Sequence, residues 1–305
     1  MSPQGLTYVL ITPARNEQDF IELTIKSVVS QSLRPVRWVI VSDGSTDATD
    51  DIVKRYAAQH DWIELHRMPE REERHFGGKV ACISAGYDKI KDLSWDVVGS
   101  LDADISFDMD FFRFLLDQFA ENPQLGVAGA PFQEEGATYD FRFSSTDHVS
   151  GACQLFRRKC FEAIGGYTPV KGGGIDVIAV LTARMKGWQT RTFPEKFCLH
   201  HRPMGSATHG AVASWFKLGE KDYRLGRHPL WQIFRSAYQM KHKPVVLGGC
   251  ALLMGYLWVW LRRGQRPVSA EVIAFQRREQ MRRLGAFLRR LLPFAHESGP
   301  ASSRA

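Results

Sequence analysis

Two aspartates separated by one residue, Asp102 and Asp104, directly follow a short apolar segment that ends at Leu101. Carboxylate oxygens are ligands that hard divalent cations prefer, and these cations commonly share such ligands with phosphate oxygens. The triplet is weakly specific by itself. Residues 108–110 form a second one, which leads into a helical pattern and is typical of a helix N-terminus. Position favours the first triplet, because only Asp102 and Asp104 come directly after a segment expected to be a buried strand.

A third candidate carboxylate, Asp43, follows the apolar segment 36–41. At the end of a strand it could accept a hydrogen bond from the N–H of a nucleobase or from a ribose hydroxyl. Gly44 is expected to let the backbone approach a ligand closely, since glycine has no Cβ atom. Asp47 opens the next helical pattern and is interpreted as a helix N-cap. Alternatively, Ser45 or Thr46 is the N-cap residue of that helix.

The elements that must position these side chains follow a regular order along the first half of the chain. Strands that alternate with helices at this spacing predict an α/β fold with a doubly wound, mostly parallel, Rossmann-like sheet. Ligands on such sheets bind beyond the carboxyl ends of the strands, where all three aspartates are expected. The predicted strands are 6–12, 36–41, 63–66, 97–101 and 126–129, and the predicted helices include 47–58, 79–90 and 111–119.

Composition and charge limit the possible partners and sites of this protein but do not decide its function. The 305 residues carry a formal charge of +7, which suggests an anionic partner such as nucleic acid, nucleotide phosphates or anionic lipid. The five scattered cysteines form no Cys-x-x-Cys pair, so neither a disulfide framework nor a zinc site is predicted, in keeping with a reducing compartment. No secretory signal is read at the N-terminus, and the active part is expected to face the cytoplasm.

The order and spacing of three motifs resemble the family 2 glycosyltransferases over the first two-thirds of the chain. The motifs are Thr12-Pro13-Ala14-Arg15-Asn16-Glu17, Val39-Ile40-Val41-Ser42-Asp43-Gly44-Ser45-Thr46-Asp47 and Leu101-Asp102-Ala103-Asp104. The resemblance implies the GT-A fold, transfer with inversion, and a nucleotide-sugar donor with Mg²⁺ or Mn²⁺. The donor-binding residues that it implies are Pro13, Ala14, Arg15, Glu17, Asp43, Lys79, Asp102, Ala103 and Asp104, with Asp104 also a metal ligand.

The second half resembles the acceptor side of the same family. The segment 151–158, followed by Gly165-Gly166-Tyr167, is similar to the family's acceptor segment. Asp176 stands where the family has its catalytic base, although Ile175 replaces the acidic residue that usually precedes it. Inversion needs one carboxylate to take the proton of the acceptor hydroxyl, and metal and cationic groups to neutralise the leaving diphosphate. The alternative is that Asp176 only caps a helix over 177–186.

A histidine pair follows the strand-like segment 197–199. His200 or His201 could complete the metal site or contact the diphosphate, and Arg202 could hold phosphate oxygens. The alternative is that both histidines are ordinary core or surface residues. Weaker candidates for the same role are His209, Lys217 and Lys221.

Two other classes of protein share some of these features. A nucleotidyltransferase would need a glycine-rich basic loop after the first strand, and residues 13–17 contain no glycine. A basic nucleic-acid binder or a pseudoenzyme would fit the charge, but the arginines lie beside an apolar run without an aromatic stacking platform, so no nucleic-acid partner is expected.

Processive family members carry Gln-x-x-Arg-Trp, whereas residues 232–236 end in Ser236, which favours transfer of a single sugar.

The C-terminal part predicts contact with a membrane. The apolar run 245–261 is 17 residues long, at the lower limit for crossing a bilayer, and carries Trp258 and Trp260 near one end. Basic residues flank it on both sides, which favours a re-entrant or interfacial helix over a single span. The arginine-rich segment 273–292 resembles a surface-lying amphipathic helix. The alternative is a buried core helix with a solvated basic neighbour.

The predicted organisation is therefore a glycosyltransferase domain over residues 1–240, divided near residue 130 into nucleotide and acceptor halves. Membrane-associated helices over 241–296 and a disordered tail over 297–305 follow. The expected acceptor is a saccharide or a lipid-linked intermediate of bacterial surface polysaccharide synthesis, at the cytoplasmic face of the inner membrane. UDP is the expected nucleotide, with GDP and dTDP left open.

Overall fold

The computed structural model describes residues 5–70, 76–134, 146–170, 173–202 and 210–291. The chain forms two compact units, residues 1–208 and 209–305. The predicted division at residue 240 falls inside the second unit, because the helix that precedes it packs with the helices that follow it. As a functional division it stays a prediction. The predicted disordered tail, 297–305, lies outside the described residues.

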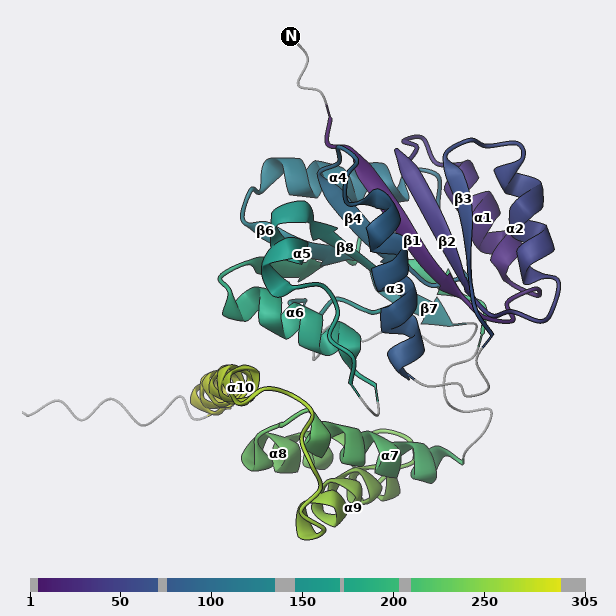
Figure 1. The fold of residues 1–305 in the computed structure, drawn as a ribbon. Coiled ribbons are helices and arrows are strands. Elements are labelled where there is room, and N and C mark those ends of the chain that lie inside the picture. The colour runs from purple at the N-terminus through teal and green to yellow at the C-terminus, as the bar shows by residue number, and fades with distance from the viewer. Residues whose placement is uncertain (1–4, 71–75, 135–145, 171–172, 203–209, 292–305) are drawn as a thin grey trace, which may run out of the picture. The chain divides into compact units, whose positions relative to one another are not determined.

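A seven-stranded sheet forms the centre of the first unit, in the order β3-β2-β1-β4-β8-β6-β9 (Figure 1). Neighbouring strands run parallel except at β8, which is antiparallel to β4 and β6. The predicted mostly parallel α/β sheet is thus confirmed. The strands are β1 (Tyr8–Ala14), β2 (Arg37–Asp43), β3 (Ile63–Met68), β4 (Val97–Leu101), β6 (Leu125–Gly129), β8 (Cys153–Arg157) and β9 (Gln189–Thr192).

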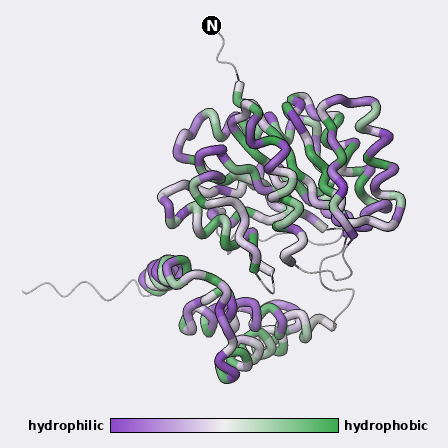
Figure 2. The backbone as a smooth tube through the Cα atoms, in the orientation of Figure 1, coloured by the Kyte–Doolittle hydropathy of each residue, from purple (hydrophilic) through white to green (hydrophobic). Residues whose placement is uncertain are grey.

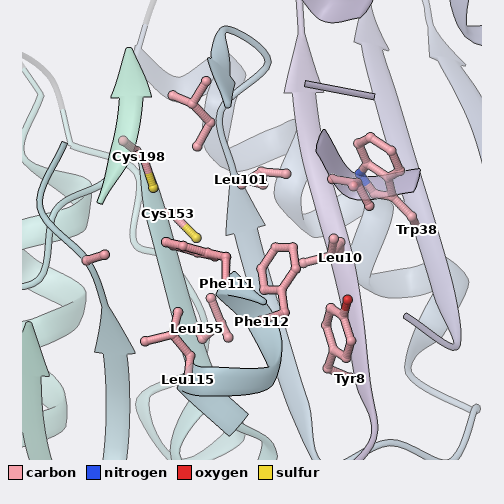
Figure 3. Close-up of a cluster of buried hydrophobic side chains, with 14 of the residues drawn as sticks. Tyr8, Leu10, Trp38, Leu101, Phe111, Phe112, Leu115, Cys153, Leu155 and Cys198 are labelled. Atoms are coloured by element: carbon pink, nitrogen blue, oxygen red, sulfur yellow. The ribbon is translucent and has the colours of Figure 1, made fainter. Parts of the chain in front are cut away.

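Alternation along each strand sends side chains to both faces of this sheet, and helices cover each face. Tyr8 and Leu10 of β1 join a buried cluster with α1 (Ile21–Val29), α2 (Thr49–Ala57) and α4 (Phe111–Glu121). Figure 3 shows part of this cluster, in which Phe111 and Phe112 lie beside strands β1 and β4. On the opposite face α3 (Phe76–Ile90) packs against β1 and β2. Hydrophobic residues are concentrated along the central strands in Figure 2.

A small second sheet completes the first unit. It has the order β5-β10-β7, with β10 (Cys198–His200) antiparallel to β5 (Ile105–Ser106) and parallel to β7 (Phe132–Glu134). Helix α5 (Arg158–Ile164) follows β8, and α6 (Ile175–Met185) precedes β9. This sheet matters for function because it joins the loop after β4 to residues almost a hundred positions later in the chain.

Four helices make up the described part of the second unit: α7 (Ala211–Arg224), α8 (Pro229–Gln239), α9 (Leu247–Leu261) and α10 (Ala270–Leu291). Helices α7 and α9 touch through their backbones. A Cβ atom on Gly219 would lie 2.1 Å from the carbonyl oxygen of Leu252, and one on Gly255 would lie 2.0 Å from that of Phe216. Such close packing through small residues is a common way for apolar helices to associate.

The predicted apolar run forms helix α9, which has one buried and one exposed side. One side of α9 is buried in the second unit through Leu252, Tyr256 and Val259, as the core-helix alternative expects. The other side exposes Met254, Trp260 and other large apolar residues. Among the described helices, none combines the length and apolar character that a membrane span requires.

Candidate active site

The carboxyl ends of β1, β2 and β4 meet at one edge of the sheet, because these strands are parallel neighbours. Ala14, Asp43 and Leu101 end the three strands. The motifs that the sequence singled out therefore converge, although Ala14 and Leu101 lie 87 positions apart in the chain.

The first two loops at this edge are hydrogen-bonded to each other. Oδ1 of Asn16 accepts the Thr46 N–H at 2.9 Å, and the Asn16 N–H donates to Oγ of Ser45 at 3.2 Å. The Glu17 N–H donates to Oγ1 of Thr49 at 2.8 Å. Asn16 has φ of 55°, a left-handed conformation that asparagine tolerates better than most residues. These hydrogen bonds hold the two loops together, and the loops form one wall of the candidate site.

Asp43 lies within this wall and is only 8% exposed. Nη1 of Arg15 is 3.7 Å from its Oδ2 atom, so an anionic and a cationic group predicted to bind the nucleotide are neighbours. The structure gives a different reason for glycine at position 44 from the close approach of a ligand that the sequence suggested. Its φ is +63°, and a Cβ atom there would lie 2.7 Å from Cα of Glu70. The space that glycine leaves open is occupied by the chain after β3.

Three other aspartates, one in the loop after β2 and two in the second Asp-x-Asp triplet, have structural roles. Oδ1 of Asp47 accepts from the Thr49 N–H at 3.0 Å and so stabilises the start of α2, although the N-cap position that the sequence assigned to Asp47 is occupied by Ala48. Both oxygens of Asp108, in the second Asp-x-Asp triplet, lie within 2.9 Å of Nζ of Lys196. Asp110 occupies the N-cap position of α4. The sequence-based choice of the first triplet agrees with this placement.

Asp102, Asp104 and His200 form the one group of potential metal ligands found among the described residues. One ligand atom from each lies within 4.8 Å of the other two. Nε2 of His200 is 3.6 Å from Oδ1 of Asp104. Asp104 is 9% and His200 8% exposed, so water competes little for these groups.

The second sheet delivers His200 to this position. His200 pairs with Ile105 across β10 and β5, and the His201 N–H donates to the carbonyl of Asp104 at 2.9 Å. Nδ1 of His200 lies 2.5 Å from the carbonyl oxygen of Arg202. Because a carbonyl can only accept, Nδ1 carries a proton, and Nε2 is the ring nitrogen that faces the carboxylates. In the neutral imidazole this nitrogen has the lone pair that can bind a metal ion.

His201, which follows the end of β10, points elsewhere. Its Nε2 atom lies 2.9 Å from Oγ of Ser106, and its ring stacks on Phe20 with centroids 6.4 Å apart. Of the two histidines predicted as ligands, the structure brings His200 to the aspartates and seats His201 against Phe20. No sequence motif singled out Phe20.

Arg202 connects two of the loops. It forms an ion pair with Glu17, and its Nε atom is 3.7 Å from Oδ2 of Asp104. Its guanidinium lies 5.4 Å from the ring centre of Phe20. The predicted phosphate-binding cation therefore stands beside the metal-ligand candidates, held there by Glu17, which the sequence assigned to the nucleotide.

Lys79 reaches the same cluster from α3. Its Nζ atom contacts Oδ1 of Asp102 at 2.5 Å and lies 3.4 Å from the carbonyl oxygen of Gly151. Burial lowers the pKa of Lys79, but Asp102 first, and then Asp176 and Asp104, outweigh it, so that its pKa lies above the ordinary value. The lysine is therefore a permanent positive charge among three carboxylates.

Asp176 belongs to this electrostatic neighbourhood. Burial is the largest influence on the pKa of Lys79, which it lowers, and on the pKa of the buried Tyr167, which it raises. The charge of Asp176 contributes to raising both pKa values. It lies in the first turn of α6, where the N-cap residue is Gly174. Asp176 is therefore not the N-cap residue, although a carboxylate in the first turn still interacts favourably with the N-terminus of the helix.

The other predicted site residues are distributed as follows. Pro13 pairs with Val41 as part of β1. Ala14 and Ala103 are 2% and 4% exposed and belong to the core, so only their backbones can reach a ligand. Lys217 and Lys221 lie on α7 of the second unit, and His209 lies outside the described residues.

Comparison with known proteins places this geometry in a family. Residues 9–165 match the model described as glycosyl transferase family 2. The poly-beta-1,6-N-acetyl-D-glucosamine synthase of Staphylococcus aureus strain MSSA476 is 31% identical over 278 residues, covering 85% of this chain and 63% of that protein. A protein of the same name from Staphylococcus epidermidis is 30% identical over 133 residues, covering 42% of this chain and 29% of that protein. The chain thus spans less than two thirds of the length of these relatives.

Solved structures share the fold at low sequence identity. One is described as the mannosyltransferase PcManGT from Pyrobaculum calidifontis in complex with GDP-Man and Mn²⁺. Its TM-score is 0.58 at 19% identity, covering 95% of this chain and 82% of that one. Another is S. aureus TarS 1–349 in complex with UDP-GlcNAc, with a TM-score of 0.53 at 13% identity, covering 93% and 81%. The GT-A architecture and the resemblance read from the sequence are confirmed, and the chain belongs to glycosyl transferase family 2.

Proposed function

We propose that this chain is a metal-dependent, inverting glycosyltransferase that moves one sugar from a nucleotide-sugar to an acceptor hydroxyl. The observation that carries the proposal is the convergence of Asp102, Asp104 and His200 beside Lys79, with Asp176 in the same electrostatic neighbourhood.

The three clustered side chains fit a divalent cation. Two carboxylates and one imidazole are a chemically suitable donor set, and their ligand atoms are close enough to share one ion. Asp102, Asp104 and His200 would hold Mg²⁺ or Mn²⁺, which when bound supplies positive charge for a diphosphate. Oδ1 of Asp102 already contacts Lys79, so its second oxygen is the one free to contribute.

The wall formed by the first two loops is the proposed nucleotide site. Asp43 can accept from a base N–H or a ribose hydroxyl, and Nη1 of Arg15 lies 3.7 Å from its Oδ2 atom. Arg202 is positioned to hold phosphate oxygens. UDP is the proposed nucleotide; the names of two structural neighbours include GDP-Man and UDP-GlcNAc, so both bases occur on this fold.

The proposed chemistry is an in-line displacement. Asp176 takes the proton of the acceptor hydroxyl while that oxygen forms a bond to the anomeric carbon. The bond from the anomeric carbon to the diphosphate oxygen breaks, and the nucleoside diphosphate leaves with the electron pair. Lys79 and Arg202 offset the charge that develops on the leaving group. The configuration at the anomeric carbon inverts because attack and departure occur on opposite faces.

A single transfer is proposed rather than polymer growth, although relatives carry the name of a polymer synthase. The supporting residue is Ser236, which stands in place of the tryptophan of the processive motif. Arg235 of the same segment is paired with the buried Asp222 inside the second unit, a structural use of a motif position. A labelled donor would separate the two cases, because a single-transfer enzyme lengthens an acceptor by one residue only.

The second unit is proposed to seat the enzyme on the cytoplasmic face of a membrane, where a lipid-linked acceptor would be presented. Helix α9 has 15 residues and is therefore about 22 Å long, shorter than a hydrocarbon core of about 30 Å. Its outward side exposes large apolar residues, and Arg262 lies over the ring of Trp258 at 3.9 Å. An interfacial helix accounts for both features. The exposed apolar residues at and before α9 are Val245, Val246, Leu247, Met254, Leu257, Trp258, Trp260 and Leu261.

A screen of nucleotide diphosphates tests the proposal directly. Ligands that bind only the native state raise its apparent stability, so UDP with Mn²⁺ is expected to raise the melting temperature more than either alone. Synergy between nucleotide and metal supports the shared site. Equal shifts with and without metal, or a response to DNA or RNA in place of nucleotides, would contradict it and favour a basic binding protein.

A further inference from the structure

Gly151 lies between the donor-side lysine and the proposed base, in the turn that leads into β8. A Cβ atom at this position would be 3.0 Å from Cβ of Asp176, 3.1 Å from its Oδ2 atom and 3.2 Å from its Cγ atom. All three contacts are tighter than ordinary van der Waals separation. The side chain of Asp176 therefore lies directly over the position that glycine leaves empty.

The backbone at Gly151 is not free to move away from Asp176. The next residue, Ala152, accepts the Asp102 N–H at 2.9 Å, and Cys153 then pairs with Leu101 across β8 and β4. The carbonyl oxygen of Gly151 itself faces Nζ of Lys79 at 3.4 Å. These contacts fix the turn to the loop that carries the metal-ligand candidates.

The start of α6 is also held, so the side chain of Asp176 is the part that can shift. Ile175, Ile178 and Ala179 are each at most 6% exposed and anchor the first turns of the helix. The carboxylate of Asp176 is half-buried and lies at the edge of the packed region. An added methyl group at residue 151 would displace it by a few tenths of an ångström or force another rotamer.

We infer that Gly151 is a positioning residue for the base: its missing side chain is what lets the Asp176 carboxylate lie beside Lys79 and the Asp102 loop. This inference rests on the proposed function, in which Asp176 takes the acceptor's proton. Misplacing a catalytic group by about 1 Å can lower a rate by about 100-fold, so a smaller displacement is expected to lower kcat by about tenfold. Donor binding depends on groups that the methyl group does not touch.

The test is a double-mutant cycle with Gly151→Ala and Asp176→Asn. Gly151→Ala is expected to lower kcat by about tenfold while leaving the affinity for UDP and Mn²⁺, measured by calorimetry, within about twofold of wild type. In the Asp176→Asn background the same glycine substitution is expected to leave the residual rate unchanged, because there is no longer a carboxylate to misplace.

Gly99→Ala is the matched control for crowding in the same sheet. Its Cβ atom would lie 2.6 Å from Cδ2 of Leu10 and away from the carboxylates. This control is expected to lower the melting temperature without lowering kcat of the folded enzyme. The contact that it disturbs is in the core drawn in Figure 3, where Leu10 and Leu155 are labelled.

The outcomes separate the two claims. Full activity of Gly151→Ala, or a tenfold loss that persists in the Asp176→Asn background, would overturn the positioning role and leave the base untouched. A loss of UDP affinity in Gly151→Ala would overturn it too, because the glycine would then act through Lys79. Full activity of Asp176→Asn alone would instead contradict the proposed function.

Discussion

His200 places its Nε2 atom 3.6 Å from Oδ1 of Asp104, and the proton on its other ring nitrogen is held by the carbonyl of Arg202. The imidazole is thus oriented with Nε2 toward the carboxylates, and Nε2 is the nitrogen that can bind a metal ion when it is unprotonated. Its neighbour His201 is bonded to Ser106 instead. Of these two adjacent histidines, only His200 is therefore placed to bind a metal ion together with Asp104.

Replacing the two histidines separately should distinguish them. His200→Ala removes one proposed ligand, and the Mn²⁺ concentration for half-maximal activity is expected to rise by at least about tenfold, in line with losses seen at metal sites. His201→Ala, the matched control, removes a contact with Ser106 and Phe20 and should leave the metal requirement unchanged. Equal effects of the two variants in a metal titration of the stripped enzyme would contradict the assignment.

The ion pair between Lys79 and Asp102 should show strong coupling. Lys79→Met leaves the carboxylate among Asp104 and Asp176 without its cation, and the free energy of unfolding is expected to fall by about 1–2 kcal/mol, below the value for fully buried pairs because both side chains are about a third exposed.

Adding Asp102→Asn to Lys79→Met should recover most of that stability without restoring activity, since the repulsion is gone but the donor-side groups are missing. Denaturant unfolding of the two single variants and the double variant measures the coupling. Additive losses of stability would show that the two groups do not interact as the structure places them.

Gly44 should be intolerant of a side chain for a reason separate from ligand binding. Gly44→Ala combines a left-handed φ of +63° with a 2.7 Å contact to Cα of Glu70, and a loss of stability of about 2–3 kcal/mol is expected. Gly187→Ala is the control, because φ there is +88° but no atom lies within 4 Å, so only strain of about 1 kcal/mol is expected. Equal melting temperatures for the two variants would refute the contact with the chain after β3.

The outward side of α9 should govern association with lipid. Replacing Trp260 and Leu261, which are 56% and 71% exposed, by serine should greatly reduce co-flotation of the full chain with vesicles of anionic phospholipid. Tyr256→Phe, on the buried side of the same helix, is the control for general damage. Unchanged flotation of the double serine variant, or wild-type protein that fails to float, would contradict the membrane proposal.

The sequence predicted the central sheet well because its strands are local patterns. The run of β-branched and apolar residues at 97–101 coincides with β4, and the segment 63–66 lies within β3. The first triplet of aspartates could be chosen over the second because its position after a buried strand is also a local property. The reversed direction of β8 has no such local signal, since a strand reads alike in either direction.

Other parts of the site depend on contacts that no local pattern records. The ion pair of Arg202 with Glu17 joins residues 185 positions apart. The choice between His200 and His201 depends on the register of β10 against β5, which has only two residues. The role of Gly151 depends on a helix that begins 24 residues later. Side-chain periodicity cannot supply these relationships, because tertiary packing determines them.

Asp104 is the proposed ligand of a divalent cation that sugar transfer requires, and the rate of transfer from a radiolabelled UDP-sugar in the presence of Mn²⁺ measures that requirement. Asp104→Asn preserves the size of the side chain but removes its charge. Its turnover is expected to fall to background while the melting temperature stays near that of wild type, and wild-type enzyme in excess EDTA should behave in the same way. Full activity of the variant, or of wild type in EDTA, would show that transfer does not depend on a metal ion held by Asp104.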